Sequence, residues 1–336
     1  LAASTMGGTF SGTATTGNIT QTGALAITGT TTLTTSANDA TITLGTDSNA
    51  FTGAITITTN DASGTDADVT IDGGTTALVI AASTVDGDLA LRTGHASGIT
   101  DTGTVTVGGN FTATTDANNG VITLDSMAVD GTFTLAPNNT GAVTIVNDAG
   151  LALAASTMGG TFSGTATTGD ITDSGALAIT GAGTFITRAT GSNIILDHAS
   201  NAFSNSVELK ADTGGNEAFG NITFVDSAAV DFDSSASANG DLFINGSTDG
   251  AVGGNLNVTA TTGNITQNVA LAVSGTTTLT TSANDATITL NNTSNSFTGA
   301  MTITTNDSSG TDADVTIDGG TTALQIAAST VDGNLT

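Results

Sequence analysis

Long internal repeats restrict the folds that this sequence can adopt. Residues 13–89 match residues 259–335 without a gap, and 65 of the 77 positions are identical. Residues 1–29 match residues 153–181 and differ only at Asn18/Asp170, Gln21/Asp173 and Thr22/Ser174. Repetition of this kind is typical of proteins in which one structural unit stacks on the next.

A shorter spacing runs beneath the long repeats. An apolar residue that follows Gly-x recurs at Leu89, Phe111 and Phe133, and the two intervals between them are equal. The separation of Phe10 and Leu89 is close to four intervals of about this size. We therefore expect about 16 turns of about 20–22 residues, the repeat length of a solenoid.

The segments between glycines alternate between apolar and polar residues. In 41–44, Ile42 and Leu44 alternate with threonines, so one face is buried and the other is wet. The repeats support this assignment, because Val79 is replaced by Gln325 while its apolar neighbours are kept. Position 79 is therefore predicted to point outward.

The composition favours strands over helices. Threonine is the most frequent residue type, glycine occurs 44 times, and no long segment has a helical period. Threonine, valine and isoleucine suit a pleated surface because they branch at Cβ. We predict an all-β fold, a parallel β-helix (β-solenoid), in which Gly, Asn and Asp form the corners.

One region is less regular than the rest. Phe162 and Leu256 are further apart in the sequence than Phe10 and Leu89, although the repeat predicts the same interval, and the region 204–250 is rich in phenylalanine. We predict that residues 1–336 form a single continuous solenoid. Within it, 204–250 would form irregular turns with an inserted loop or hairpin.

The charge of the chain excludes several classes of partner. Lys and Arg together number 3 against 30 carboxylates, for a formal charge of −27. Binding of nucleic acid needs cations that neutralise phosphates, so we expect no nucleic-acid partner. The longest apolar run, Ala77 to Ala82, is too short to span a membrane, so we expect no membrane insertion. Cations and neutral surfaces such as sugars remain as partners.

Several stretches resemble the filamentous-haemagglutinin-like adhesins, which are large bacterial exoproteins often exported by two-partner secretion. They are Val252–Gln267, Ala24–Gly29, Asn49–Ala54 and Ala77–Gly87. The resemblance implies a right-handed β-helix that is extracellular or on the bacterial cell surface. It also implies the structural shaft of an adhesin or a fibre, such as one of a biofilm matrix.

Both ends of the sequence fall inside a repeat. We therefore expect either a longer chain or copies that assemble end to end, and lateral assembly into a fibre is also open. The other expected partner is a glycan on a host or neighbouring cell. A lectin-like surface on 204–250 is the alternative to a purely structural role.

Calcium is the one ligand for which the sequence offers candidate residues. Two copies of Gly-Thr-Asp-Ala-Asp-Val-Thr-Ile-Asp-Gly-Gly place aspartates on what we expect to be one side of a strand, and hard cations prefer clustered oxygens. The candidates are Asp66, Asp68, Asp72, Asp312, Asp314 and Asp318. In the alternative interpretation these residues shape turns and keep the surface soluble.

No arrangement of residues predicts catalysis. The three cations, Arg92, Arg188 and Lys210, are isolated, and His95 and His198 lie in unrelated turns. Enzymes built on β-helices gather carboxylates with basic residues on one face, so we expect that this chain is not an enzyme. Thr-x-Thr segments such as 56–58 also raise ice binding, but their spacing is not fixed.

Overall fold

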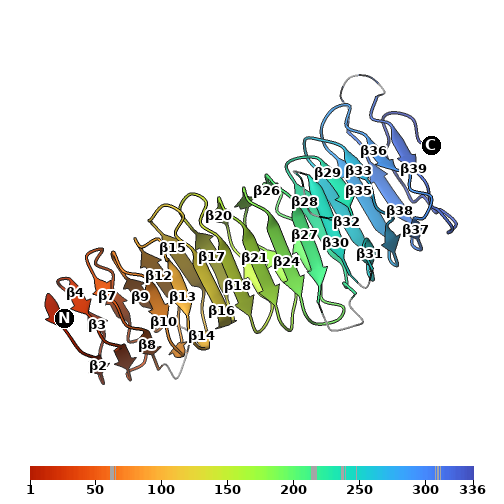
Figure 1. Ribbon diagram of the computed structural model, residues 1–336. Helices are drawn as coiled ribbons and strands as arrows, with labels where there is room; N and C mark the ends of the chain where they lie inside the picture. Colours follow the sequence, from red (N-terminus) through yellow and green to blue (C-terminus); the bar gives the residue numbers. More distant parts are fainter. Residues whose placement is uncertain are drawn as a thin grey trace. The chain divides into compact units, whose positions relative to one another are not determined.

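The computed structural model shows an all-β protein, and no helix of its described residues is long and apolar enough to cross a membrane. The structure describes residues 1–60, 64, 66–212, 218–235, 238, 240–246, 248–306, 308, 310 and 312–336. These residues form two compact units, Leu1–Phe162 and Ser163–Thr336. In each unit the strands lie side by side and pair in parallel (Figure 1).

The first unit contains two long parallel sheets. Sheet I consists of β3 (Ile19–Thr20), β6 (Ile42–Leu44), β9 (Val69–Asp72), β12 (Leu89–Thr93), β15 (Phe111–Thr115), β17 (Thr132–Ala136) and β19 (Leu151–Leu153). Sheet II consists of β2 (Phe10–Ala14), β5 (Thr31–Thr35), β8 (Ile55–Thr58), β10 (Leu78–Ile80), β11 (Ser83–Val85), β13 (Ile99–Asp101), β14 (Val105–Val107), β16 (Ile122–Val129) and β18 (Val143–Asn147). A third, short sheet holds β1 (Ser4–Met6), β4 (Leu25–Ile27) and β7 (Ala50–Phe51).

The second unit repeats this arrangement. Sheet III consists of β22 (Ile171–Asp173), β25 (Ile194–Leu196), β28 (Ile222–Asp226), β32 (Leu256–Ala260), β35 (Thr277–Thr281) and β38 (Met301–Thr304). Sheet IV consists of β24 (Gly183–Thr187), β27 (Val207–Ala211), β30 (Asp241–Asn245), β29 (Val230–Asp233), β33 (Ile265–Gln267), β36 (Ile288–Leu290) and β39 (Val315–Ile317). The short strands are β23 (Leu177–Ile179) with β26 (Ala202–Phe203), and β31 (Ala251–Val252), β34 (Ala272–Val273) and β37 (Ser296–Phe297). The strands β20 (Ser156–Met158) and β21 (Phe162–Ala166) lie next to the boundary between the units.

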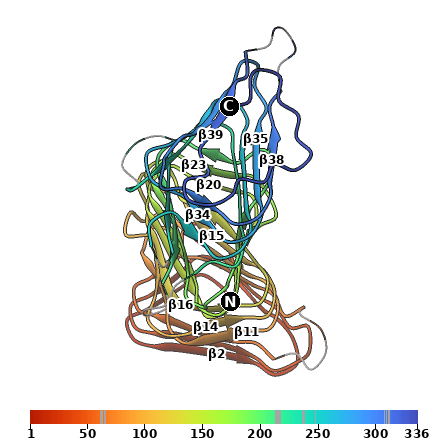
Figure 2. The ribbon, with the colours of Figure 1, turned by 90° about the vertical axis from the view of Figure 1, so that its right-hand side faces the viewer.

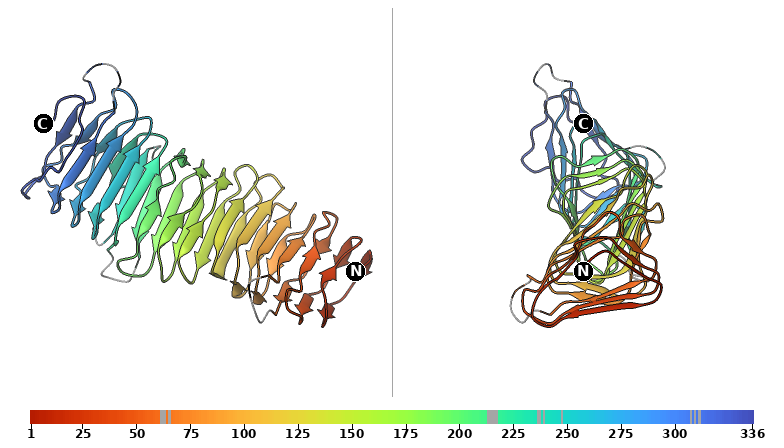
Figure 3. Two further views of the ribbon diagram at one scale, coloured as in Figure 1. Left: turned by 180° about the vertical axis from the view of Figure 1, so that it is seen from behind. Right: turned by 90° about the vertical axis from the view of Figure 1, so that its left-hand side faces the viewer.

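The core of each unit is a stack of apolar side chains from successive turns. Leu89 pairs with Phe111 and Phe111 with Phe133, and all three are fully buried. The rings of Phe111 and Phe133 lie 5.6 Å apart between centroids. In the first unit the turns, red through yellow in Figures 2 and 3, wrap around this common interior. The predicted parallel β-solenoid is therefore confirmed.

The predicted alternation of faces is also confirmed. In β10, Leu78 and Ile80 are buried, whereas Val79 between them is only half-buried. Most residues that point inward are apolar because the neighbouring turns cover them with apolar atoms, and buried threonines such as Thr277 are the exceptions. Outward positions tolerate a polar side chain because water reaches them.

The predicted number of turns was wrong. Sheet I contributes seven strands and sheet III six, one to each turn, so the described chain makes about 13 turns rather than 16. Leu89 pairs with Phe111 across a short turn, whereas Ile42 pairs with Val69 across a turn that contains more of the sequence. Many turns carry a third strand and longer corners. Phe10 and Leu89 moreover belong to different sheets, so their spacing is not a whole number of turns.

The strands of the irregular region follow an order that differs from the order of the chain. In sheet IV, β30 pairs with β27 and, in parallel, with β29, so it lies between two strands that both precede it. The neighbouring turns are correspondingly long, since Val207 pairs with Leu242 and Val230 with Ile265. The loop or hairpin predicted in 204–250 falls partly on 213–217, 236, 237, 239 and 247, which lie outside the described residues. That prediction stays a prediction.

We predict that substitutions of two threonines in β35 change stability in opposite directions. Thr277 is fully buried between Leu256 and Met301, and its hydroxyl has no hydrogen-bond partner. Thr281 is equally buried, but its hydroxyl donates to the carbonyl oxygen of Ala286 at 3.1 Å. We expect Thr277→Val to raise the free energy of unfolding by about 1 kcal/mol, and Thr281→Val to lower it by about 1–2 kcal/mol. Urea titrations at neutral pH measure both changes, and equal effects of the two variants would contradict this account.

Candidate functional site

The predicted calcium residues of the first copy do not share one strand. The strand β9 begins at Val69, so Asp66 and Asp68 precede it. The chain bends there, because the N–H of Asp68 donates to the carbonyl oxygen of Asp66 at 2.9 Å. The expectation that these two carboxylates lie on one side of a strand was therefore wrong.

Asp68 begins a series of hydrogen bonds between turns that we call the corner ladder. Its Oδ1 accepts the N–H of Asp88 at 2.8 Å, and Oδ1 of Asp88 accepts the N–H of Asn110 at 2.6 Å. Oδ1 of Asn110 then accepts the N–H of Thr132 at 3.0 Å. Each side chain thus satisfies a backbone donor at the same corner of the next turn.

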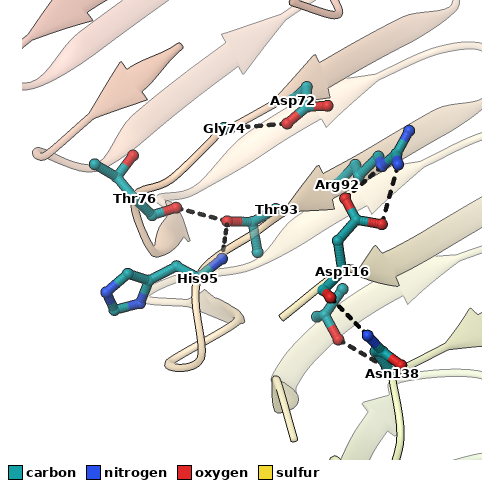
Figure 4. A network of polar contacts seen from close by, with 9 residues as sticks. Asp72, Gly74, Thr76, Arg92, Thr93, His95, Asp116 and Asn138 are labelled. Carbon is teal, nitrogen blue, oxygen red and sulfur yellow. Dashed lines mark hydrogen bonds and ion pairs between the residues drawn. The ribbon is translucent and has the colours of Figure 1, made fainter. Parts of the chain in front are cut away.

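Asp72 has a different role, which Figure 4 shows. Its Oδ1 accepts the N–H of Gly74 at 2.8 Å, and Gly74 has a φ of 59°, a conformation that glycine adopts without strain. Asp72 is only 6 % exposed, and this burial raises the pKa of its carboxyl group. The side chain therefore holds a tight corner of the solenoid.

The second copy has the same geometry. Oδ1 of Asp314 accepts the N–H of Asn334 at 2.6 Å, and Oδ1 of Asp318 accepts the N–H of Gly320 at 2.7 Å, while Asp312 is exposed. The structure brings the three carboxylates together in neither copy, since the one close group of three acidic or histidine side chains among the described residues lies elsewhere. Calcium binding at these positions stays a prediction.

The two arginines and the two histidines make local contacts. Arg92 lies 2.7 Å from Asp116 across neighbouring turns, and Arg188 lies 3.4 Å from Asp212. In each histidine turn the ring accepts a backbone N–H two residues on, that of Ser97 at His95 and that of Ser200 at His198. Figure 4 shows His95 at the corner next to Thr93, turned away from Arg92. These groups stabilise turns.

The close carboxylates are those of Asp231, Asp233 and Asp241, which we call the acidic cluster. One oxygen of each lies within 4.8 Å of the others. Parallel pairing of β29 with β30 sets Asp231 opposite Asp241, and Asp241 is buried. Asn268, in the turn after β33, donates to Asp231 at 2.9 Å and to Asp233 at 3.1 Å.

The members of the acidic cluster differ electrostatically. Burial raises the pKa of Asp231, whereas hydrogen bonding, above all from Asn268, lowers the pKa of Asp233. Oxygens this close together suit a hard cation, although acidic groups of this kind are common without one. The alternation in Asp231-Phe232-Asp233 is visible in the sequence, but the approach of Asp241 depends on the unusual order of the strands.

Phe243 adds an aromatic ring to the outer face beside this cluster. The other phenylalanines of the irregular region, Phe219, Phe224 and Phe232, are buried, whereas Phe243 is half-buried and pairs with Asp233. The sequence concentrates four phenylalanines here without indicating which of them points outward.

Comparison with known families accounts for most of the chain. Residues 1–58, 66–138, 140–210 and 239–304 match a family described as repeats of unknown function (DUF5649). The chain belongs to this family. No curated protein and no solved structure matches it.

The DUF5649 repeat corresponds to about three turns of the solenoid. The first matched stretch, 1–58, contains the sheet II strands β2, β5 and β8, one from each of three successive turns. Residues 211–238, which include β28 and β29, fall outside the match. Asp231 and Asp233 therefore belong to a part of the chain that departs from the family repeat.

The corner ladder predicts how stability responds to changes at Asp68. Asp68→Ala leaves the N–H of Asp88 without its acceptor and should lower the free energy of unfolding by about 1 kcal/mol. Asp68→Asn keeps an oxygen acceptor and should be close to neutral. Urea titrations of the two variants, each with calcium and with EDTA, measure the effect. A loss in Asp68→Asn that appears only with calcium would favour the metal interpretation instead.

The burial of Asp226 leads us to predict that stability depends on pH. Asp226 ends β28, is 3 % exposed and accepts the N–H of Phe203 at 3.1 Å. Burial is the main reason why its pKa lies above the ordinary 3.8. The folded state therefore binds this proton more tightly than the unfolded chain. The resulting stabilisation is complete below pH 3.8 and is lost as the pH rises through the raised pKa.

We expect the urea concentration at the midpoint of unfolding to decrease as the pH is raised from about 4 to about 7. The decrease should be smaller in Asp226→Asn, because the side chain of that variant stays neutral. The variant also separates this effect from the general repulsion among carboxylates, which it leaves almost unchanged. If the urea midpoint changed equally with pH in the parent and in Asp226→Asn, Asp226 would not contribute to the pH dependence of stability.

Proposed function

We propose that this chain is a structural segment, part of the solenoid shaft of a secreted or cell-surface bacterial protein such as a large adhesin or an extracellular fibre. The observation that carries the proposal is how the polar side chains are used. In the corner ladder, Asp68, Asp88 and Asn110 each bind the backbone of the next turn. Groups that an enzyme would direct at a substrate here hold one turn to another.

The core supports the same conclusion. Inward positions such as Leu89, Phe111 and Phe133 are fully buried by their neighbours in adjacent turns. Stacked solenoid turns gain their stability from these contacts between neighbours, so turns can be added without a change of architecture. A spacer needs this property, whereas a catalytic site does not.

The charge and the resemblance support an extracellular place of action. A formal charge of −27 keeps such a surface soluble and opposes non-specific association with anionic surfaces. The stretches that resemble filamentous-haemagglutinin-like adhesins, such as Val252–Gln267, suggest export and display on a bacterial cell. Partners of the shaft would be further copies of itself or a glycan of another cell.

Electron microscopy of the source cells with gold-labelled antibodies against this chain tests the proposal. We expect label along hairs or filaments outside the cell envelope, and loss of label after brief treatment of intact cells with a broad-specificity protease. Label confined to the cell interior would overturn the proposal.

A structural shaft should tolerate the loss of one whole turn. Leu89 pairs with Phe111 in register, so deletion of 89–110 joins equivalent points of neighbouring turns. We expect this variant to remain folded, with a melting temperature within about 5 °C of the parent, because each turn contacts only its neighbours. Deletion of 89–99, about half a turn, should abolish cooperative unfolding because apolar residues lose their register. Circular dichroism during heating measures both, and equal behaviour of the two deletions would contradict the model of interchangeable turns.

A further inference from the structure

A groove of about 360 Å³ lies on the outer surface of sheet III in the second unit. It crosses β25, β28 and β32 and reaches β35, so four successive turns contribute to it. Its polar lining consists of asparagines and threonines, and no lining residue is charged. The groove therefore presents an uncharged surface in a chain with a formal charge of −27.

The floor of the groove is a row of outward side chains in register. Thr223 pairs with Asn257 and Asn257 with Thr278, and all three are half-buried. Strands of one sheet are about 4.8 Å apart, so the row presents a polar group at that interval. Within the part of the chain that the structure describes, these three side chains make no hydrogen bond. Their donors and acceptors are free for a ligand.

One wall of the groove is a second corner ladder. Its asparagine side chains, unlike those of the floor, are hydrogen-bonded within the fold. Oδ1 of Asn221 accepts the N–H of Asn255 at 2.9 Å, and Oδ1 of Asn255 accepts the N–H of Thr276 at 2.9 Å. These bonds fix the amide planes at the rim of the groove. At the far end Ile195, which pairs with Thr223, adds a half-buried apolar surface.

We propose that this groove binds a neutral, linear glycan that lies across the turns. Amides and hydroxyls each donate and accept hydrogen bonds, as sugar hydroxyls do, and an aliphatic side chain can contact the C–H face of a sugar ring. The charge of the chain disfavours anionic glycans, and the uncharged lining offers no partner for a cationic one. The inference does not depend on the structural role proposed above, but it gives one of the partners named there, a glycan, a site and a chemical class.

The internal repeat provides matched substitutions. At the offset of 246 that relates the copies, Asn255 and Asn257 correspond to Thr9 and Ser11, whereas Thr276 and Thr278 correspond to threonines. These two asparagines therefore distinguish the groove from the corresponding segment at the start of the chain. Asn257→Ser removes a free amide without breaking a hydrogen bond of the fold, so it separates binding from stability.

Calorimetric titration of the whole chain with hexasaccharides tests the proposal. The neutral probes are β-1,4-linked glucose and N-acetylglucosamine hexamers, and an oligogalacturonate of equal length is the anionic comparison. We expect at least one neutral hexamer to bind and the oligogalacturonate not to bind. Asn257→Ser should weaken binding by about three- to tenfold, the effect of one or two lost hydrogen bonds. Thr278→Arg, which fills the groove, should abolish it.

Asn291→Ser is the control, because Asn291 is exposed, lies outside the groove and should not affect affinity. Melting curves establish that each variant is folded. Absence of binding by every neutral hexamer up to about 10 mM would overturn the proposal. Unchanged affinity in both groove variants would overturn it too. Thermal hysteresis without sugar binding would assign the threonine row to ice instead.

Discussion

The structure depends on the fact that no turn of this chain can bury its own apolar residues. A single turn encloses only a few inward side chains, and it hides them only when further turns lie above and below. Parallel pairing in register places Leu89, Phe111 and Phe133 over one another. The same pairing satisfies the backbone, so the core and the hydrogen bonds form together.

This constraint explains why an acidic chain with few cations can be stable. Many polar side chains are bound to the backbone of a neighbouring turn, as in the corner ladder from Asp68 to Thr132. Their burial carries an electrostatic cost, visible in the raised pKa of Asp72 and Asp226. The structure offsets that cost with N–H donors, and Arg92 adds one ion pair on the surface.

The features with binding potential lie where this regularity changes. In sheet IV the insertion of β30 between β27 and β29 brings Asp241 to Asp231 and turns Phe243 outward. In sheet III, Asn255 and Asn257 stand where the other copy has Thr9 and Ser11, and they line an uncharged groove. Asn255 binds the backbone of the next turn, whereas the amide of Asn257 is not used by the fold. A repeated scaffold can thus gain a local site without losing its stacking.

The sequence by itself determined the class of the fold, the repeats and the face of most strand residues, because alternation is a local property that Val79 and Gln325 reveal directly. Only the tertiary structure decided the number of turns, the different sheets of Phe10 and Leu89, and the separation of Asp66, Asp68 and Asp72 into different roles. The physical reason is register. Which residues pair between neighbouring turns depends on the length of each corner and on how the turns stack. No single segment of the sequence specifies this register by itself.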